Sequence, residues 1–448
     1  MLHFVLESTI YESLNCDWLH FEPLIRAAKN NIENSISFLP AATSLYLLDS
    51  PALQNKIAKY WVENNYIPEA YISHTLNHKK IKIGYFSPDF KDHPLTTLLG
   101  KVFELRDRDI FETYAFNLSP PVEDISQKKL RANFDFFLDV SSLSDTDLKS
   151  LILSKEIDIA VNLIGFFGDY SRPNIFATRC APIQISYMYA STMSMPTMDY
   201  IIADSVTTPL EFSDNFAEKI IQLPGSFYSL SPLEYEENFL SKDELGIPSD
   251  KFVFCCFNMP YKINPFIFKL WNEILASCPD SILILREISK AVSANIKKFA
   301  IEYGYSADRI IFINSSNKSV YYSLLKECDL FIDTYPYGAH TVAIEAAYWG
   351  LPILTLQGKN FASRVASSIL INLECEQLIT YKTDEFIKKA VYFYNNRDVL
   401  LKIRESLLLK RNTSEIYDCQ RFTKNLEKSY LATYNQKLLN LPSDHILI

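Results

Sequence analysis

Apolar residues recur at two different spacings along the chain, and the change between them divides it into regions. Over Asp17–Asn34 and again over Pro51–Tyr66 they recur with helical spacing, which predicts amphipathic helices within residues 1–78. From Lys80 onward, short apolar runs alternate with helical stretches. This alternation is typical of a parallel sheet whose strands are joined by crossover helices.

The predicted strands form two series with a polar segment between them. The strands of the first series are Ile81–Phe86, Ile157–Leu163, Ile183–Tyr187 and Tyr200–Ala203. Those of the second series are Phe252–Phe257, Ile282–Leu285, Ile310–Ile313, Leu330–Asp333 and Pro352–Leu356. The accompanying helices are predicted at Ser144–Lys155, Pro265–Cys278, Ala291–Tyr303, Ser319–Cys328 and Ser414–Tyr434. Residues 229–250, between the two series, are acidic and punctuated by proline, which indicates a boundary between two α/β units.

The pattern as a whole predicts an α/β fold with four regions. A helical cap (residues 1–78) precedes two Rossmann-like domains (79–240 and 241–413), and a C-terminal helix and tail (414–448) follow. Two such domains would place a ligand cleft between them, outside the carboxyl ends of their strands. This architecture hosts many activities, so the function has to be argued from individual residues.

Composition and charge narrow the classes of partner. The 448 residues carry a formal net charge of −9 and no basic stripe, so we expect no nucleic-acid partner. No stretch reaches the roughly 20 apolar residues that span a bilayer, and Met1–Glu7 lacks the basic region of a signal peptide. The eight cysteines include no CxxC pair, which argues against a zinc or redox motif and fits a cytoplasmic protein.

A phosphate site is the first candidate chemistry, in the segment Asp333–Glu345. A predicted strand ends there, a loop with proline and glycine follows, and a helix is predicted to begin near His340 and Thr341. Free amides at a helix N-terminus bind phosphate, and these two side chains would add a ring N–H and a hydroxyl. Glu345, one turn into the helix, would reach a ribose. An ordinary helix cap beside a buried histidine explains the local pattern equally well.

Two further candidates each follow the first strand of one unit. Lys262 would face the cleft, where its ammonium could neutralise charge on a departing diphosphate. His93 has a side chain suited to proton transfer. The plain alternatives are a solvated lysine and a loop histidine. Asp145 and Asp147 have the DxD spacing of metal-dependent sugar transferases, but they start a helix, where acidic residues are favoured anyway, so we expect no metal site.

These segments, taken in order, resemble the catalytic region of the O-linked N-acetylglucosamine transferase and SPINDLY family. The similarity covers nearly the whole chain, from about Cys16 to the last helix. Family members often carry a long tetratricopeptide repeat array before the catalytic region, and this sequence does not include one. The segments that carry the resemblance are Ile81–Phe90 with His93-Pro94, Ala181–Gln184, Met198–Asp204, Tyr261–Pro265, Arg309–Phe312, His340-Thr341 and Ala362–Ala366.

The resemblance implies a GT-B fold, in which domain 79–240 lies on the acceptor side and domain 241–413 binds the nucleotide sugar. It implies a UDP-sugar donor, UDP-N-acetylglucosamine first, no metal or other cofactor, and an inverting transfer to a protein or peptide, at a Ser/Thr hydroxyl first. Lys262 would stabilise the leaving group, and His93 would lie near the sugar and the acceptor. The nucleotide-sugar-binding residues implied in this way are Tyr261, Lys318, Tyr321, His340, Thr341 and Glu345.

The chain also departs from the family pattern. The turn Leu-Gly-Tyr-Pro-Gly-Thr reads Tyr187–Thr192 here, with Met188 and Ser191 in place of the two glycines. Met259 and Val342 replace polar residues, and Tyr321 replaces a histidine that stacks on uracil. The alternative to an active transferase is therefore a non-catalytic, transferase-like subunit that recruits substrate for an active glycosyltransferase. A partner protein or an oligomer is also left open. Transfer to a lipid or small molecule would predict an exposed basic amphipathic surface, which the sequence does not suggest.

Overall fold

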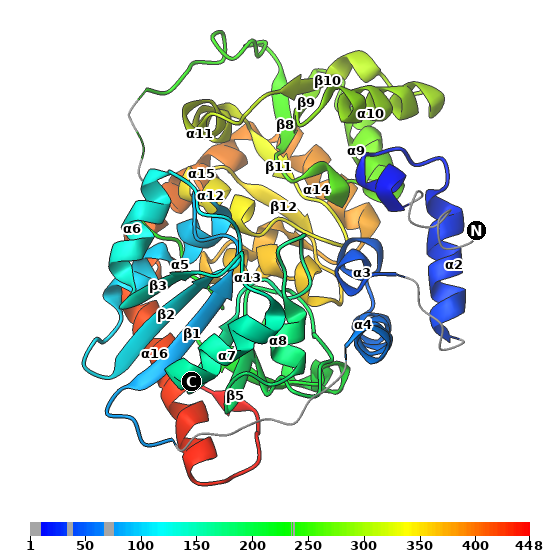
Figure 1. The fold of residues 1–448 in the computed structure, drawn as a ribbon. Coiled ribbons are helices and arrows are strands. Elements are labelled where there is room, and N and C mark those ends of the chain that lie inside the picture. Colours follow the sequence, from blue (N-terminus) through cyan, green and yellow to red (C-terminus); the bar gives the residue numbers. More distant parts are fainter. Residues whose placement is uncertain (1–9, 34–38, 67–75, 234, 236–237) are drawn as a thin grey trace. The chain divides into compact units, whose positions relative to one another are not determined.

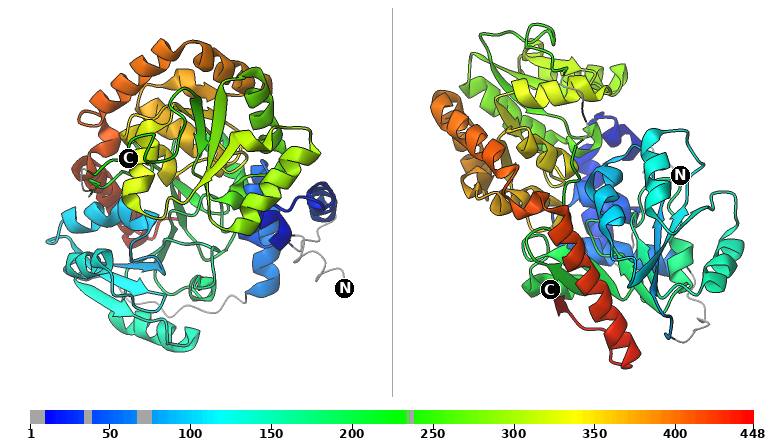
Figure 2. Two further views of the ribbon diagram at one scale, coloured as in Figure 1. Left: turned by 90° about the horizontal axis from the view of Figure 1, so that it is seen from above. Right: turned by 90° about the vertical axis from the view of Figure 1, so that its left-hand side faces the viewer.

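The computed structural model describes residues 10–33, 39–66, 76–233, 235 and 238–448. The chain folds into two compact units, each assembled from segments that are distant in sequence. Unit 1 comprises Met1–Asn31, Tyr46–Asp49 and Glu234–Ser414. Unit 2 comprises Ile32–Leu45, Ser50–Leu233 and Glu415–Ile448. Figures 1 and 2 show the elements of each unit along the colour ramp.

The described part of the N-terminal region is helical, as the apolar spacing predicts. Residues 10–14 are helical, and the helices α2 (Phe21–Glu33), α3 (Ala41–Leu47) and α4 (Pro51–Asn65) follow. Ser50 caps α4 by accepting a hydrogen bond from the amide of Leu53, and Pro51 occupies the first helical turn, where its missing N–H costs nothing. The predicted range Pro51–Tyr66 thus ends one residue beyond the observed helix.

Unit 2 is built on a parallel sheet with the strand order β14-β7-β6-β5-β4-β1-β2-β3. Its strands are β1 (Ile81–Ser87), β2 (Phe111–Asn117), β3 (Phe136–Asp139), β4 (Ile159–Asn162), β5 (Ile183–Ser186), β6 (Tyr200–Asp204), β7 (Lys219–Leu223) and β14 (Ile446–Leu447). Its other helices are α5 (Pro94–Leu105), α6 (Ile125–Asn133), α7 (Asp145–Lys155), α8 (Pro173–Ala177) and α16 (Cys419–Leu438).

The C-terminal helix α16, the long red helix of Figure 2, belongs to unit 2 and packs on α5, β5 and β7. It begins at Cys419 rather than at Ser414 as predicted. A short 3-10 turn (Glu415–Tyr417) comes first, and the side chain of Asp418 then caps α16 by accepting from the amide of Arg421. The sequence prediction was wrong at this boundary because apolar spacing does not distinguish a 3-10 turn from the first turn of an α-helix.

Unit 1 contains a second parallel sheet, with the order β10-β9-β8-β11-β12-β13. Its strands are β8 (Phe252–Cys256), β9 (Ser281–Arg286), β10 (Ile310–Ile313), β11 (Leu330–Ile332), β12 (Ile353–Leu356) and β13 (Ile379–Thr380). The helices between and after them are α9 (Pro265–Ser277), α10 (Lys290–Glu302), α11 (Lys318–Glu327), α12 (Thr341–Tyr348), α13 (Val365–Asn372), α14 (Thr383–Asn395) and α15 (Arg397–Lys410).

Each sheet has a point where the strand order reverses. In unit 1 the chain moves outward from β8 through β9 and β10, then returns to β11 on the other side of β8. In unit 2 the same reversal separates β1 from β4. Ligands of doubly wound sheets bind outside the carboxyl ends of the strands at such points. The loops after β8 and β11 are therefore where a site is expected in unit 1.

In the described part of the chain, no helix has the length and apolar character needed to cross a membrane.

Candidate active site

Lys262 and the loop after β11 meet at the reversal point of unit 1. Lys262 ends a 3-10 turn (Pro260–Lys262) that follows β8, and β11 is the strand paired with β8. The Lys262 ammonium donates to the carbonyl oxygen of Gly338 over 2.9 Å. Its Nζ also lies 3.9 Å from the centre of the Tyr337 ring, a cation–π contact.

Burial makes the charge of Lys262 responsive to its surroundings. The residue is only 8% exposed. Loss of hydration lowers the pKa of its ammonium to about 8, and the nearby Asp333 carboxylate opposes that shift. An ammonium held in this way has few competing water contacts, so an incoming anion would interact with it strongly.

Asp333 organises the loop that faces Lys262. Its Oδ1 accepts from the amides of Thr334 (2.7 Å) and Ala339 (2.8 Å) and from Nδ2 of Asn258 (3.0 Å). Its Oδ2 accepts from the hydroxyl of Thr355 (2.8 Å). Burial raises the pKa of Asp333, and these donors oppose the shift. Both ends of the 334–339 loop are thereby tied to one carboxylate.

His340 stands at the start of α12, and its protonation follows from its contacts. Nε2 lies 3.1 Å from the carbonyl oxygen of Ala362. A carbonyl oxygen only accepts, so Nε2 carries the proton. Burial, reinforced by the Lys262 charge, lowers the pKa of His340 well below its usual value, so the ring is neutral and Nδ1 is its acceptor. Thr341 is the first residue of α12, and the His340 side chain does not cap that helix.

Tyr321 and Glu345 form a hydrogen-bonded pair between α11 and α12. The Tyr321 hydroxyl donates to Oε2 of Glu345 over 2.9 Å. Burial raises the pKa of Glu345 to about 7, while Tyr321, Lys318 and Arg286 act in the opposite direction. Lys318, the exposed first residue of α11, thus lies close enough to Glu345 to affect its charge.

Tyr261 precedes Lys262 and is part of the same 3-10 turn. Its ring packs against that of Tyr46 from α3, with the ring centres 5.5 Å apart and the planes at 56°. Burial raises the pKa of its hydroxyl. The predicted residues Tyr261, Lys262, Lys318, Tyr321, His340, Thr341 and Glu345 all belong to unit 1.

His93 belongs to unit 2, where it caps α5. Its Nδ1 accepts from the amide of Leu95 over 3.2 Å, and its Nε2 lies 3.8 Å from Oδ1 of Asp89. Burial lowers the pKa of His93, and the Asp89 carboxylate opposes that shift. The neutral ring therefore carries its proton on Nε2, which makes that atom a donor; its acceptor nitrogen is used by the helix cap.

The altered turn in unit 2 keeps a conformation that favours glycine. Met188, in place of the first family glycine, has φ 63°, in the left-handed region. Glu218, 1% exposed, accepts from the hydroxyl of Thr192 (2.5 Å) and from the amide of Met193 (2.7 Å). Burial raises the pKa of this carboxyl. A buried acid therefore holds the end of the turn, at Thr192 and Met193.

The DxD residues have structural partners. Asp145 accepts from the guanidinium of Arg172 (2.7 Å) and the amide of Asn174 (3.0 Å), and Asp147 interacts with the capping Ser144. Among the described residues, no three His, Cys, Asp or Glu side chains are grouped so that they could hold a metal ion.

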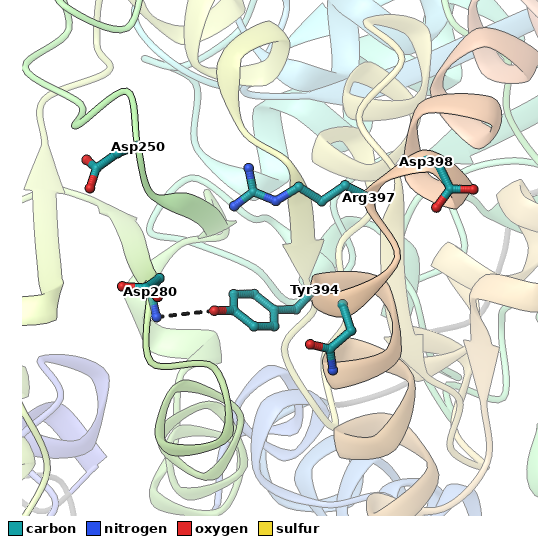
Figure 3. Close-up of a pocket in the computed structure, with 6 residues that line it drawn as sticks. Asp250, Asp280, Tyr394, Arg397 and Asp398 are labelled. Atoms are coloured by element: carbon teal, nitrogen blue, oxygen red, sulfur yellow. Dashed lines mark hydrogen bonds between the residues drawn. The ribbon is translucent and has the colours of Figure 1, made fainter.

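A surface pocket of about 790 Å³ lies elsewhere in unit 1 (Figure 3). Its lining residues are Asp250, Asp280, Tyr394, Asn395, Arg397 and Asp398. Asp250 and Asp280 precede β8 and β9, so this pocket is at the amino ends of the strands, opposite the Lys262 loops. Three carboxylates beside one guanidinium would repel a diphosphate, and we do not assign the donor site here.

Sequence reasoning missed several residues that build the site. Asn258, 2% exposed, donates to both Asp333 and the hydroxyl of Thr334, and Ala362 supplies the carbonyl that faces His340. Arg286 ends β9 near Tyr321 and Glu345. One signal was available for Asn258, because it is a polar residue just beyond the end of the predicted strand Phe252–Phe257, next to the predicted strand that ends at Asp333.

Comparison with known proteins identifies the family. Residues 56–231 and 234–426 match the family model of glycosyl transferase family 41. The chain belongs to glycosyl transferase family 41. The match extends over both units of this family 41 chain and includes every candidate residue from His93 to Glu345.

Relatives and a solved structure agree with this family. A probable UDP-N-acetylglucosamine–peptide N-acetylglucosaminyltransferase SEC of Arabidopsis thaliana is 31% identical over 365 residues, covering 80% of this chain and 37% of that protein. A second relative is the probable UDP-N-acetylglucosamine–peptide N-acetylglucosaminyltransferase SPINDLY of Solanum lycopersicum. It is 25% identical over 387 residues, covering 84% of this chain and 40% of that protein. The family 41 chain thus spans well under half the length of these relatives.

The fold is that of a GT-B glycosyltransferase. A mutant of the Thermobaculum terrenum O-GlcNAc transferase superposes with a TM-score of 0.84 at 24% identity, covering 96% of this chain and 83% of that one. This likeness and the two doubly wound parallel sheets confirm the predicted fold class, with two Rossmann-like units in this family 41 chain.

Proposed function

We propose that this chain transfers a sugar from a UDP-sugar, N-acetylglucosamine first, to a protein side chain, a Ser or Thr hydroxyl first. Family 41 membership and the names of the relatives support a UDP-N-acetylglucosamine donor and a peptide acceptor. The observation that carries the proposal is the buried ammonium of Lys262 beside the N-terminus of α12.

Lys262 would stabilise the leaving group. As the bond between the sugar and the diphosphate breaks, negative charge develops on the β-phosphate. A buried ammonium held by one carbonyl and one aromatic face retains N–H donors for that oxygen, and it is already partly desolvated before the ligand arrives. Because Lys262 supplies the positive charge, we propose that the transfer requires no metal ion.

The start of α12 would hold the diphosphate. The first-turn amides of a helix and its dipole favour an anion there, and Thr341 adds a hydroxyl. In the ligand-free protein, Nδ1 of His340 is an acceptor and cannot donate to a phosphate oxygen. His340 would donate to the phosphate only after Nδ1 gains a proton, and the negative charge of the phosphate favours that protonation.

The nucleoside would lie along α11 and α12. Glu345 has Oε2 occupied by Tyr321, which leaves Oε1 to accept from a ribose hydroxyl. The Tyr321 ring would offer a face to the uracil, and Lys318 would contact the nucleoside from the start of α11. Tyr261 would contribute to the same donor site from the turn that carries Lys262.

On the acceptor side, the Nε2–H of His93 would donate a hydrogen bond to an oxygen of the sugar or of the acceptor, because Nδ1 is occupied by the helix cap. We propose direct displacement with inversion at the anomeric carbon: the acceptor oxygen bonds to that carbon as the bond to the diphosphate breaks on the opposite face of the sugar, UDP departs, and the hydroxyl proton is released to solvent. The eight cysteines are all buried and form no disulfide, which supports a reducing compartment such as the cytoplasm.

The test is donor turnover by the purified chain without added metal, comparing UDP-N-acetylglucosamine, UDP-glucose and GDP-fucose. We expect UDP-N-acetylglucosamine to be cleaved and transferred to peptide, and expect EDTA to leave the rate unchanged. Turnover that depends on an added divalent ion would overturn the metal-independent assignment, and turnover of GDP-fucose alone would overturn the donor assignment.

A second function is supported by the altered residues. Met188 at a left-handed position, Ser191, Met259 and Val342 together remove glycine and polar groups from segments that approach the donor in the family pattern. These changes favour a non-catalytic subunit that binds UDP and recruits substrate for an active partner. UDP binding with no turnover of any of the three donors would select this function.

A further inference from the structure

An aspartate from the N-terminal region ties together two loops of the candidate donor site. Asp49 follows α3 and belongs to unit 1 with the loops that it contacts. Its Oδ2 accepts from the hydroxyl of Tyr335 over 2.7 Å. Its Oδ1 accepts from the amides of Lys359 and Asn360, each over 2.8 Å. One carboxylate thus binds residues that lie 286 to 311 positions away from it in the sequence.

The chain leaves space for this carboxylate. A Cβ on Gly358 would lie 2.6 Å from Oδ2 of Asp49, closer than real Cβ contacts allow. Asn360 adds a second link, because its Nδ2 donates to the carbonyl of Leu48 over 2.9 Å. The 358–360 loop therefore packs closely around Asp49, because Gly358 leaves room for the carboxylate and the Asn360 side-chain amide binds the adjacent Leu48 carbonyl.

Each contact of Asp49 leads directly to a residue of the candidate site. Tyr335 lies in the 334–339 loop that Asp333 holds, and Gly338 in that loop accepts from Lys262. Asn360 accepts from the amide of Ser363 over 2.7 Å and so shapes the turn that contains Ala362.

The carbonyl of Ala362 closes the connection. It accepts from the amide of Gly338 (3.1 Å) and faces Nε2 of His340 (3.1 Å). The two loops that Asp49 joins are the same two loops that fix the Lys262 acceptor and the His340 ring.

We propose that Asp49 is a positioning residue for the nucleotide-sugar site, joining the 334–339 loop to the 358–363 loop so that the Gly338 carbonyl holds Lys262, and the Ala362 carbonyl holds His340, beside the diphosphate. The assignment of a diphosphate ligand rests on the proposed function, whereas the joining of the two loops does not. Residues 46–49, which belong to unit 1, would thus support the donor site and are not only part of a helical cap.

The variants separate hydrogen bonding from charge. Asp49→Ala removes every hydrogen bond that the carboxylate accepts from its three donors, Tyr335, Lys359 and Asn360. Asp49→Asn keeps an oxygen for the two amides and offers an N–H to the Tyr335 oxygen. This variant should therefore keep the two loops joined. Tyr335→Phe removes one bond and leaves the backbone bonds intact, which provides a milder variant if Asp49→Ala does not fold. Asp384→Ala on α14 is the matched control, because Asp384 is an exposed acid of unit 1 whose carboxylate pairs with Lys388 on the same helix.

The measurements are hydrogen–deuterium exchange of segment 334–340 in the free protein and the affinity for UDP by calorimetry. We expect faster exchange of 334–340 in Asp49→Ala and in Tyr335→Phe, and about tenfold weaker UDP binding in Asp49→Ala, because small misplacements of positioning groups are costly. Asp49→Asn and Asp384→Ala should resemble the parent chain in both.

Unchanged exchange and unchanged UDP affinity in folded Asp49→Ala or Tyr335→Phe would overturn the positioning role. An equal loss in Asp384→Ala would do the same, since the effect would then be general. If the parent chain binds no UDP, the proposed donor is wrong, and the exchange of 334–340 alone decides whether Asp49 holds the loops.

Discussion

The ammonium of Lys262 and the carbonyl oxygen of Gly338 are joined by a hydrogen bond of 2.9 Å. The amide of the same glycine donates to Ala362, whose carbonyl also faces His340. The lysine and the histidine expected to contact the diphosphate are therefore held through one short loop, and Asp333 fixes both ends of it.

Asp333→Asn should move the alkaline limb of the pH profile of kcat/KM to lower pH. The groups facing Lys262 are Asp333 and Cys256, which favour its charge, the Tyr337 ring, and the neutral His340. Activity that needs the ammonium falls as pH rises through about 8, the pKa of Lys262. Loss of the Asp333 charge should shift that limb down by about one pH unit.

Thr355→Val is the control for that shift, because it removes a donor to Asp333 without changing charge. A profile that is the same in Asp333→Asn and the parent chain would show that Asp333 does not set the charge of Lys262.

Glu345→Gln should remove a pH dependence of stability. Burial raises the Glu345 pKa to about 7 from a usual value of 4.5, so the native state holds a proton that the unfolded state releases. The parent chain therefore loses stability as pH rises from about 4.5 through 7, by about 3 kcal/mol for this group. Denaturant unfolding of both chains at pH 5 and pH 8 measures the change in the free energy of unfolding with pH. An equal change in Glu345→Gln and in the parent chain would contradict the prediction.

Gly165→Ala should be far more damaging than Gly168→Ala. Both glycines have positive φ (61° and 71°), so each alanine carries a similar backbone cost. A Cβ at Gly165 would lie 2.3 Å from the Tyr189 ring, whereas one at Gly168 meets nothing within 4 Å. We expect Gly165→Ala to cost about 2 kcal/mol more in free energy of unfolding. Equal costs would mean that the turn around Tyr189 adapts readily.

His93→Asn and His93→Ala should separate the two roles of His93. An asparagine oxygen can cap α5 in place of Nδ1, so His93→Asn should keep the stability of the parent chain, whereas His93→Ala should lose about 1 kcal/mol. Both should lose transfer activity if the Nε2–H contacts the reactants. Full activity in His93→Asn would leave His93 with the cap as its only role.

Sequence patterns predicted the parts of the fold that local spacing determines. The apolar runs at Phe252–Phe257 and Leu330–Asp333 became paired strands, and the residues after them became the site loops. The helix beginning at Thr341 was also predicted. Strand β2 (Phe111–Asn117) was not, because its polar residues Glu112, Thr113 and Asn117 interrupt the apolar run, although most of the strand is buried.

The contacts that shape the site could not be predicted in the same way. Asp49 and Tyr335 are 286 residues apart, and no local pattern links them. The tautomers of His93 and His340 depend on an amide and on a carbonyl supplied by the fold. The raised pKa of Glu345 comes from burial by tertiary packing. The family resemblance indicated His93, His340 and Glu345, but their protonation and their partners follow only from the folded structure.

The central claim is that the buried ammonium of Lys262 drives departure of the diphosphate. The most direct measurement is metal-free cleavage and transfer of UDP-N-acetylglucosamine by Lys262→Ala and the parent chain, with UDP affinity measured on both. If this ammonium stabilises the leaving diphosphate, Lys262→Ala loses turnover by at least about a hundredfold and remains folded. Turnover within a fewfold of the parent chain would contradict the assigned role of Lys262.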